Sequence, residues 1–265
     1  MTGPTESALL AAVEQSPAAA AAHDRAGWVG LFSRDGRVED PVGSRPHTGP
    51  NEVGAFYDTF IGPRDIGFHR DLDIVRGTSV IRDLELEVRM SSAVTMRIPA
   101  FLRYDLSQVD GDWKIALLRA YWELPAMVVQ FARNGASALP AGIQLARGLM
   151  RNQRLRGAIG FGEGFRRVGS RQKTLVDTFV NAVGRGDSFA ALQSLLSGAT
   201  ITFGDDEAAD VAALIDRCPG ATATKVIASG TTVVASVGAG HWRGVLFADV
   251  ARRGTGIRQV RYFPQ

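Results

Sequence analysis

Apolar and polar residues alternate along two consecutive segments in the first half of the chain. The pattern runs through residues 66–75 and 79–90. A period of two places successive side chains on opposite faces of a β-strand. Two further strands are predicted at 94–106 and 113–122, separated by the turn Val109-Asp-Gly-Asp112. Together the four segments predict an antiparallel sheet with one face that must be buried.

Three segments with helical spacing precede these strands and can cover that face. The first is alanine-rich and runs from Glu6 to about Ala22, and the second is short and follows Asp24, a plausible N-cap. The third covers residues 50–61. Between the second and third helices a short strand is predicted at Gly36–Pro41, ended by the proline.

Residues 174–265 repeat this order of elements in a shorter form. A helix is predicted at 174–196 with a break near Gly184-Arg-Gly-Asp187, then a strand at 199–203 and a helix at 206–217. Four strands follow at the end of the chain: 223–228, 231–237, 244–250 and 257–263. The chain is therefore predicted to hold two tandem α+β domains, residues 1–125 and 174–265, joined by a helical linker at 126–173.

The charge of the chain is concentrated in that linker. The whole sequence has a net charge of +3 and a pI near 9.3. Residues 126–173 carry a net charge of +8, whereas residues 1–125 carry −5 and residues 174–265 carry 0. Because neither flanking domain is basic, and the linker lacks interleaved aromatic residues, a nucleic-acid partner is not predicted.

Several other classes are excluded by the composition. No apolar run reaches the roughly 18–20 residues that a membrane-spanning helix needs, and residues 1–10 do not read as a secretory signal. The single cysteine, Cys218, rules out a disulfide framework and fits a reducing cytoplasm, the predicted location. The four histidines lack metal-ligand spacing, and no phosphate-binding or nucleophile motif occurs, so no metal or cofactor is predicted.

The most informative motif lies within residues 31–57. It reads Val38-Glu-Asp-Pro-Val-Gly-Ser44 and is followed by Pro46, Gly49 and the pair Phe56-Tyr57. This motif resembles that of the bacterial ketosteroid isomerases, members of the superfamily shaped like nuclear transport factor 2. The resemblance extends over about residues 16–123.

The resemblance implies a fold and a candidate base. The fold is a cone, or open α+β barrel, in which a curved sheet is wrapped by three helices and the mouth takes a flat apolar ligand. By resemblance, Asp40 removes a proton next to a ketone and returns it two carbons away, which requires a carboxylate facing an apolar cavity. The cone wall is expected to include the ligand-binding residues Trp28, Phe32, Val38, Phe56, Phe60, Phe101, Tyr104 and Tyr121.

The two donors that such enzymes use to hold the enolate oxygen are missing from the matching positions. Ser16 stands where the tyrosine should be, and Ala100 or Phe101 stands where the protonated acid should be. Losing one such donor lowers turnover by a factor of about 10²–10³. The hydroxyl groups of Tyr57, Tyr104 and Tyr121 are the candidate substitutes. We assign the catalytic role to Tyr57 together with Asp40.

The second domain and the linker are expected to serve other purposes. Matching strand to strand places Phe203 at the position of the base, so the second domain is predicted to be degenerate, with a structural or dimerisation role. In the linker, Arg147, Arg151 and Arg154 form the basic face of an amphipathic helix. That face can be a solvated surface, dock on a protein partner, or lie on an anionic membrane as a peripheral contact.

Two functions of different classes fit the sequence. The first is binding of a small hydrophobic, steroid- or polyketide-like ligand with proton transfer by Asp40. The second is a non-catalytic ligand carrier, assembly module or membrane adaptor that uses the second domain and the basic linker. The missing donors argue against a true steroid isomerase.

Overall fold

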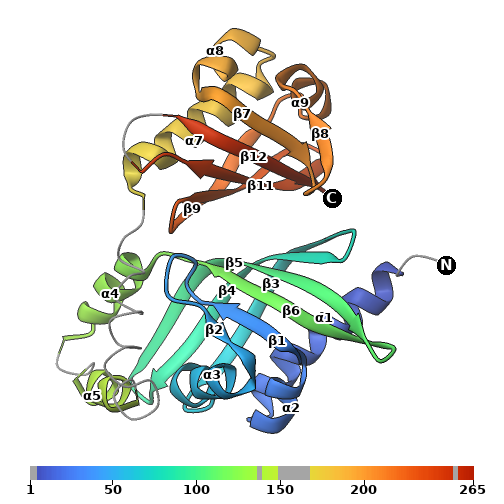
Figure 1. The fold of residues 1–265 in the computed structure, drawn as a ribbon. Helices are drawn as coiled ribbons and strands as arrows, with labels where there is room; N and C mark the ends of the chain where they lie inside the picture. Colours follow the sequence, from blue (N-terminus) through green and yellow to red (C-terminus); the bar gives the residue numbers. More distant parts are fainter. Residues whose placement is uncertain (1–4, 136–138, 149–167, 253–255) are drawn as a thin grey trace. The chain divides into compact units, whose positions relative to one another are not determined.

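The computed structural model describes residues 5–135, 139–148, 168–252 and 256–265. It separates into two compact units, Met1–Phe165 and Arg166–Gln265, each with its own core (Figure 1). Each unit is described by itself below. Within the described ranges, no helix is long and apolar enough to cross a membrane.

The first unit begins with the three predicted helices, which lie along one side of its sheet (Figure 1). The third helix is not α-helical throughout, because its last turn is a π-helix closed by a hydrogen bond of 2.8 Å from Gly62 N–H to the Tyr57 carbonyl. The helices are α1 (Glu6–Ala21), α2 (Arg25–Gly30), α3 (Gly49–Phe56) and the π-helix η1 (Tyr57–Ile61).

Six strands form the sheet of the first unit. Their order across the sheet is β2-β1-β6-β5-β4-β3. The strands β3 to β6 pair antiparallel as predicted, but β1 pairs parallel to β6, so the sheet is mixed rather than purely antiparallel. The strands are β1 (Phe32–Glu39), β2 (His47–Thr48), β3 (Asp65–Arg76), β4 (Ser79–Ser91), β5 (Val94–Val109) and β6 (Asp112–Tyr121).

The predicted alternation explains which face of the sheet meets the helices. On β5 every second residue from Met96 to Tyr104 is buried in one core together with Leu9 and Val13 of α1 and Trp28 of α2. Burial of such side chains is the main favourable contribution to folding. The helix-facing side of the sheet is therefore the side on which a cavity can form.

The second unit repeats the topology of the first. Its strand order, β8-β7-β12-β11-β10-β9, corresponds strand for strand to that of the first unit, including a parallel pair, β7 with β12. Its elements are α7 (Ser170–Gly184), α8 (Ser188–Gln193), β7 (Leu195–Phe203), β8 (Glu207–Ala209), α9 (Val211–Arg217), β9 (Thr222–Ser229), β10 (Thr232–Ala239), β11 (Trp242–Val250) and β12 (Ile257–Pro264).

One boundary in the second unit differs from the prediction. The helix expected at 206–217 begins at Val211, because the N-cap is Asp210, whose side chain accepts a hydrogen bond from the Ala213 N–H. The residues before it form β8, the edge strand paired with β7. The helix start predicted at residue 206 is therefore wrong by five residues.

Two helices lie within the segment that the sequence assigned to a linker. They are α4 (Leu124–Ala132) and α5 (Leu139–Gly148). Both belong to the first unit, in which α4 contacts β5 and α5 contacts η1 and β4. Residues 149–167 lie outside the described residues, so a separate linker domain at 126–173 stays a prediction.

Candidate functional site

The helix-facing side of the first sheet encloses an apolar pocket of about 240 Å³. The helices α1, α2 and α3, the π-helix η1 and the sheet contribute to its wall, and α4 adds three side chains. Its lining residues are Ser16, Ala20, Trp28, Asp40, Phe56, Phe60, Ile61, Arg64, Ile66, Phe68, Leu86, Val88, Met90, Met96, Ile98, Leu102, Tyr104, Leu118, Trp122, Met127, Val128 and Phe131. A cavity with many apolar and few polar groups is typical of a site for a small apolar ligand.

Asp40 is the acidic group in this lining. It lies directly after β1, and its Oδ1 accepts a hydrogen bond of 2.5 Å from the Trp122 indole N–H. Burial raises the pKa of Asp40 to about 6, and the hydrogen bond from Trp122 opposes the rise. A carboxylate with a pKa close to neutral is a suitable general base.

The backbone after Asp40 is held by two hydrogen bonds. The Asp40–Pro41 peptide bond is cis. The Val42 N–H donates a hydrogen bond of 2.8 Å to the Ala120 carbonyl on β6, and the Gly43 N–H donates one of 2.8 Å to Glu39 Oε1. Gly43 has a φ of 95°, a conformation that favours glycine. These contacts hold the turn of the signature against the sheet and direct Asp40 toward the pocket.

Tyr104 supplies a hydroxyl group to the same lining. Burial raises its pKa to about 12, while the nearby Arg82 cation and a hydrogen bond with Ser16 oppose the rise. Ser16 Oγ in turn accepts a hydrogen bond of 3.1 Å from the Trp28 indole N–H. The protonated Tyr104 hydroxyl and the Ser16 hydroxyl thus form a neutral polar pair in an apolar wall.

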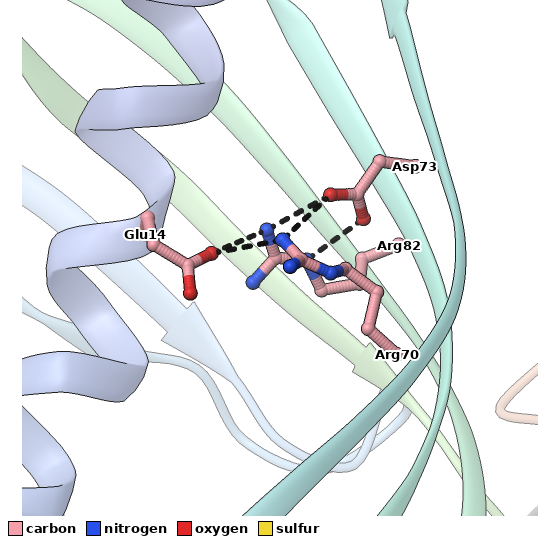
Figure 2. Close-up of polar contacts among 4 residues, drawn as sticks. All are labelled: Glu14, Arg70, Asp73 and Arg82. Carbon is pink, nitrogen blue, oxygen red and sulfur yellow. Dashed lines mark hydrogen bonds and ion pairs between the residues drawn. The ribbon is translucent and has the colours of Figure 1, made fainter.

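An ion-pair network fixes α1, the helix that carries Ser16, against the sheet (Figure 2). Arg82 on β4 is 2% exposed and contacts both Asp73 oxygens, at 2.8 and 3.0 Å, and Glu14 of α1 at 3.0 Å. Arg70 adds contacts of 3.2 Å to Glu14 and 3.3 Å to Asp73. The network sits beside Tyr104, so it fixes the position of the hydroxyl pair.

Arg64 is the one cation among the described residues that line the pocket. It follows η1 in the chain and is 7% exposed. Burial lowers the pKa of the Arg64 guanidinium. A cation in an apolar wall is unusual, because charged groups are rarely buried without a partner.

The structure brings five of the predicted site residues into the pocket lining and leaves the others outside it. Those in the lining are Trp28, Asp40, Phe56, Phe60 and Tyr104. Phe32, Val38 and Tyr57 lie in the core without lining the pocket. Phe101 and Tyr121 pair across β5 and β6, on the opposite face from Ile98, Leu102 and Tyr104. The roles assigned to these residues stay predictions.

Tyr57, the tyrosine paired with Asp40 in the sequence hypothesis, points elsewhere. Its hydroxyl is buried and has no hydrogen-bond partner among the described residues. Its ring packs 5.6 Å from the Trp28 ring, between centroids, and lies close to Gly62. Of the three tyrosines proposed as substitute donors, Tyr104 is the one in the lining.

Several lining residues were missed by the sequence reasoning. Arg64 and Trp122 were not singled out, although Trp122 ends the last predicted strand beside the turn of Asp40. The three residues of α4 were assigned to a linker, where their apolar spacing could have indicated a surface that packs on the first domain. The described ranges contain no group of three His, Cys, Asp or Glu side chains that could hold a metal ion. That the protein binds no metal stays a prediction.

The second unit has no comparable pocket among its described residues. A small void of about 10 Å³ in this unit is lined by residues that include Tyr262, Leu246 and Cys218. Phe203, at the end of β7, packs with its ring centroid 6.3 Å from that of Tyr262. Asp249 lies on the other face of β11 from Leu246 and pairs with Arg261 at 2.9 Å.

The basic face of the predicted linker helix is described only in part. Arg147 lies in the last turn of α5 and is exposed. Arg151 and Arg154 lie outside the described residues. A membrane or protein partner for this face therefore stays a prediction.

Residues 8–130 match the family described as Nuclear transport factor 2 (NTF2) domain. RV0760c from Mycobacterium tuberculosis, solved in complex with estradiol-17beta-hemisuccinate, is 26% identical with a TM-score of 0.40, over 44% of this chain and 95% of that chain. Delta 5-3-ketosteroid isomerase from Mycobacterium sp. is 28% identical with a TM-score of 0.41, over 45% of this chain and 95% of that chain.

A putative SnoaL-like polyketide cyclase from Jannaschia sp. CCS1 is 14% identical with a TM-score of 0.40, over 49% of this chain and 95% of that chain. No curated protein matches the chain. The matching part of this chain is in each case about half of its length or less.

Proposed function

We propose that the first unit, which carries a nuclear transport factor 2 domain at residues 8–130, binds a flat apolar carbonyl compound and transfers a proton on it. The observation that carries the proposal is Asp40, a carboxylate whose pKa is about 6 in the wall of an apolar pocket. Such a group is ionised at neutral pH and still basic enough to take a proton from carbon.

The pocket groups divide the reaction between them. The Asp40 carboxylate removes a proton from the carbon next to the ligand carbonyl, and the pair of electrons moves onto the carbonyl oxygen as an enolate. Tyr104, with Ser16 behind it, supplies the neutral hydroxyl donor that stabilises the enolate oxygen. The protonated Asp40 then returns the proton to a carbon of the enolate system. The apolar lining holds the flat body of the ligand.

The test follows proton exchange in an apolar ketone, 5-androstene-3,17-dione, by NMR in deuterated buffer. Asp40→Asn removes the base and keeps its shape, so we expect exchange to fall to the background rate while binding persists. In the unmodified protein the exchange rate should rise with pH up to about 6 and level off above it, because the ionised form of Asp40 is the base. Exchange that is unchanged in Asp40→Asn rules out this role.

A matched pair of tyrosine variants identifies the donor. Tyr104→Phe removes a hydroxyl in the lining, and we expect a loss of about 10²-fold in exchange rate. Tyr57→Phe removes a hydroxyl that is buried outside the lining, and exchange should be unaffected. The reverse result would restore Tyr57 as the donor. Ligand binding with no exchange in the unmodified protein would favour the ligand-carrier function.

A further inference from the structure

Arg64 has no carboxylate partner among the described residues. The neighbouring Asp65 pairs with His23 and with Arg89, each at 3.3 Å, and Asp58 pairs with Arg25 at 2.7 Å. The acids closest in the chain are thus engaged by other cations. The positive charge of Arg64 stays uncompensated in the wall of the pocket.

The contacts of Arg64 use only part of its guanidinium. Nη1 donates a hydrogen bond of 2.6 Å to the Thr59 carbonyl at the end of η1, and Nε donates one of 3.3 Å to Met90 Sδ. Nη2 has no hydrogen bond to any residue that the structure describes. This atom is not fully buried, so a ligand can reach it. The first contact caps a helix end, and the second is weak because sulfur is a poor acceptor. Nη2 is therefore a donor available to a ligand.

The position of Arg64 in the pocket is remote from the hydroxyl pair. Arg64 contacts Met90 near the end of β4, whereas Tyr104 pairs with Val80 near its beginning. The wall between them is apolar, formed by Leu86, Val88, Met96 and Ile98. A ligand that reaches both groups must be elongated and apolar in its middle.

We propose that Arg64 binds a carboxylate at one end of the ligand, so that the ligand class of this pocket is an elongated apolar carboxylic acid. This inference rests on the proposed function, because it concerns the same pocket. One guanidinium balances one negative charge, and the lining offers no second cation for a dianion such as a phosphate monoester. A charge-assisted hydrogen bond in an apolar site is strong, which makes the carboxylate a determinant of specificity.

The experiment compares two probes that differ in one negative charge and one methyl group. Estradiol-17β-hemisuccinate carries a carboxylate, and its methyl ester has the same body and linker without the charge. Binding to the full chain is measured by titration calorimetry at pH 7.5. We expect the unmodified protein to bind the acid at least about tenfold more tightly than the ester.

Two variants locate that preference. Arg64→Met keeps the apolar stem and removes the charge, so the acid should lose its preference while ester affinity changes by less than about threefold. Arg97→Met, at a side chain that is 65% exposed and pairs with Glu85 and Glu87, makes the same change in net charge and should keep the preference. Urea unfolding checks that both variants fold.

The outcomes separate this inference from the function on which it rests. Equal binding of acid and ester by the unmodified protein overturns the anion site and leaves the proposed apolar pocket intact. A preference that survives in Arg64→Met overturns it as well. If neither probe binds the unmodified protein, the proposed binding of a steroid-like ligand fails. The assignment of a carboxylate site to Arg64 then fails with it.

Discussion

Asp40 is the residue at which burial has the clearest consequence for the protein. Its pKa is raised from 3.8 to about 6 by burial, so the folded protein binds a proton there more tightly than the unfolded chain does. Between about pH 4 and pH 6 the folded state holds more protons, and stability therefore falls as the pH rises through this window. About two pKa units correspond to about 3 kcal/mol.

This linkage predicts a pH-dependent difference between the unmodified protein and Asp40→Asn. At pH 4 both carry a neutral side chain, and their free energies of unfolding should be similar. Above pH 6 the variant should be more stable by up to about 3 kcal/mol, because it holds no buried charge. Urea unfolding at pH 4, 5, 6 and 7 measures the difference.

An exposed aspartate on β1, the strand that directly precedes Asp40, provides the control. Asp35→Asn lies on β1, where Asp35 is exposed and accepts a hydrogen bond from Ser33. Its free energy difference from the unmodified protein should stay within about 0.5 kcal/mol at each pH. A constant difference for Asp40→Asn across the series would contradict the raised pKa.

The sequence identifies Asp40 but not the residues around it. Asp40 belongs to a contiguous motif, so a resemblance was enough to find it. Trp122 and Arg64 reach the pocket from far along the chain, and only the folded sheet brings Trp122 within 2.5 Å of Asp40. Tyr57 was the reasonable choice because it sits in the motif, yet the π-turn that begins at Tyr57 belongs to a helix whose lining residues are Phe60 and Ile61.

At the scale of elements, α1 is held to the sheet by the network of Arg82, Asp73, Glu14 and Arg70 (Figure 2). The two acids of this network differ in environment. The Asp73 side chain is 15% exposed and the Glu14 side chain is 54% exposed. Removing a partner from a buried ion is far more destabilising than removing an exposed one.

The network therefore predicts unequal effects of two similar changes. Asp73→Asn leaves the buried Arg82 without its main partner, and we expect a loss of about 3 kcal/mol in the free energy of unfolding. Glu14→Gln should cost less than about 1 kcal/mol, because Glu14 is half exposed. Urea unfolding at neutral pH compares them.

A double variant separates charge burial from packing. Asp73→Leu combined with Arg82→Met replaces the pair with apolar side chains, and it should recover much of the loss seen in Asp73→Asn. Equal losses for Asp73→Asn and Glu14→Gln would show that the buried pair does not hold α1.

Individual strands could be predicted from their local alternation of apolar and polar residues. The pairing of strands that lie far apart in the chain could not. The alternation at 66–75 and 79–90 predicted two strands, which lie within β3 and β4. The parallel pairing of β1 with β6 joins residues about 80 positions apart, as in Val38 with Leu118, and no local pattern encodes it. The helix start at Val211 depends on which of three nearby aspartates caps it, and composition alone does not decide that.

At the scale of the whole molecule, the chain holds two units with the same strand order, and the described residues line a large pocket in the first unit and a small void in the second. The first encloses about 240 Å³, and the second encloses about 10 Å³ around Tyr262. The sequence predicted the repeat of topology and a degenerate second domain from Phe203. Only the structure shows that the cavity itself is filled.

This difference predicts one ligand site per chain. Titration with estradiol-17β-hemisuccinate methyl ester should give a stoichiometry of one. Ile98→Trp places a larger side chain into the wall of the first pocket and should abolish all binding. Val109→Trp, at an exposed position near the end of β5, is the control and should bind normally. A stoichiometry of two, or binding that remains in Ile98→Trp, would place a site in the second unit.

The π-turn of η1 is a part of the pocket wall in which the chain length can change by one residue without a change in the sheet. A π-helix holds one more residue in its turn than an α-helix does. Deleting one residue between Phe56 and Phe60 would restore an α-helical turn, and the residues after it would keep their places, because the π-turn already accommodates one extra residue. Phe60 and Ile61 would stay in the wall while every strand kept its register. The chain within this one turn can thus gain or lose a residue, and the fold is preserved.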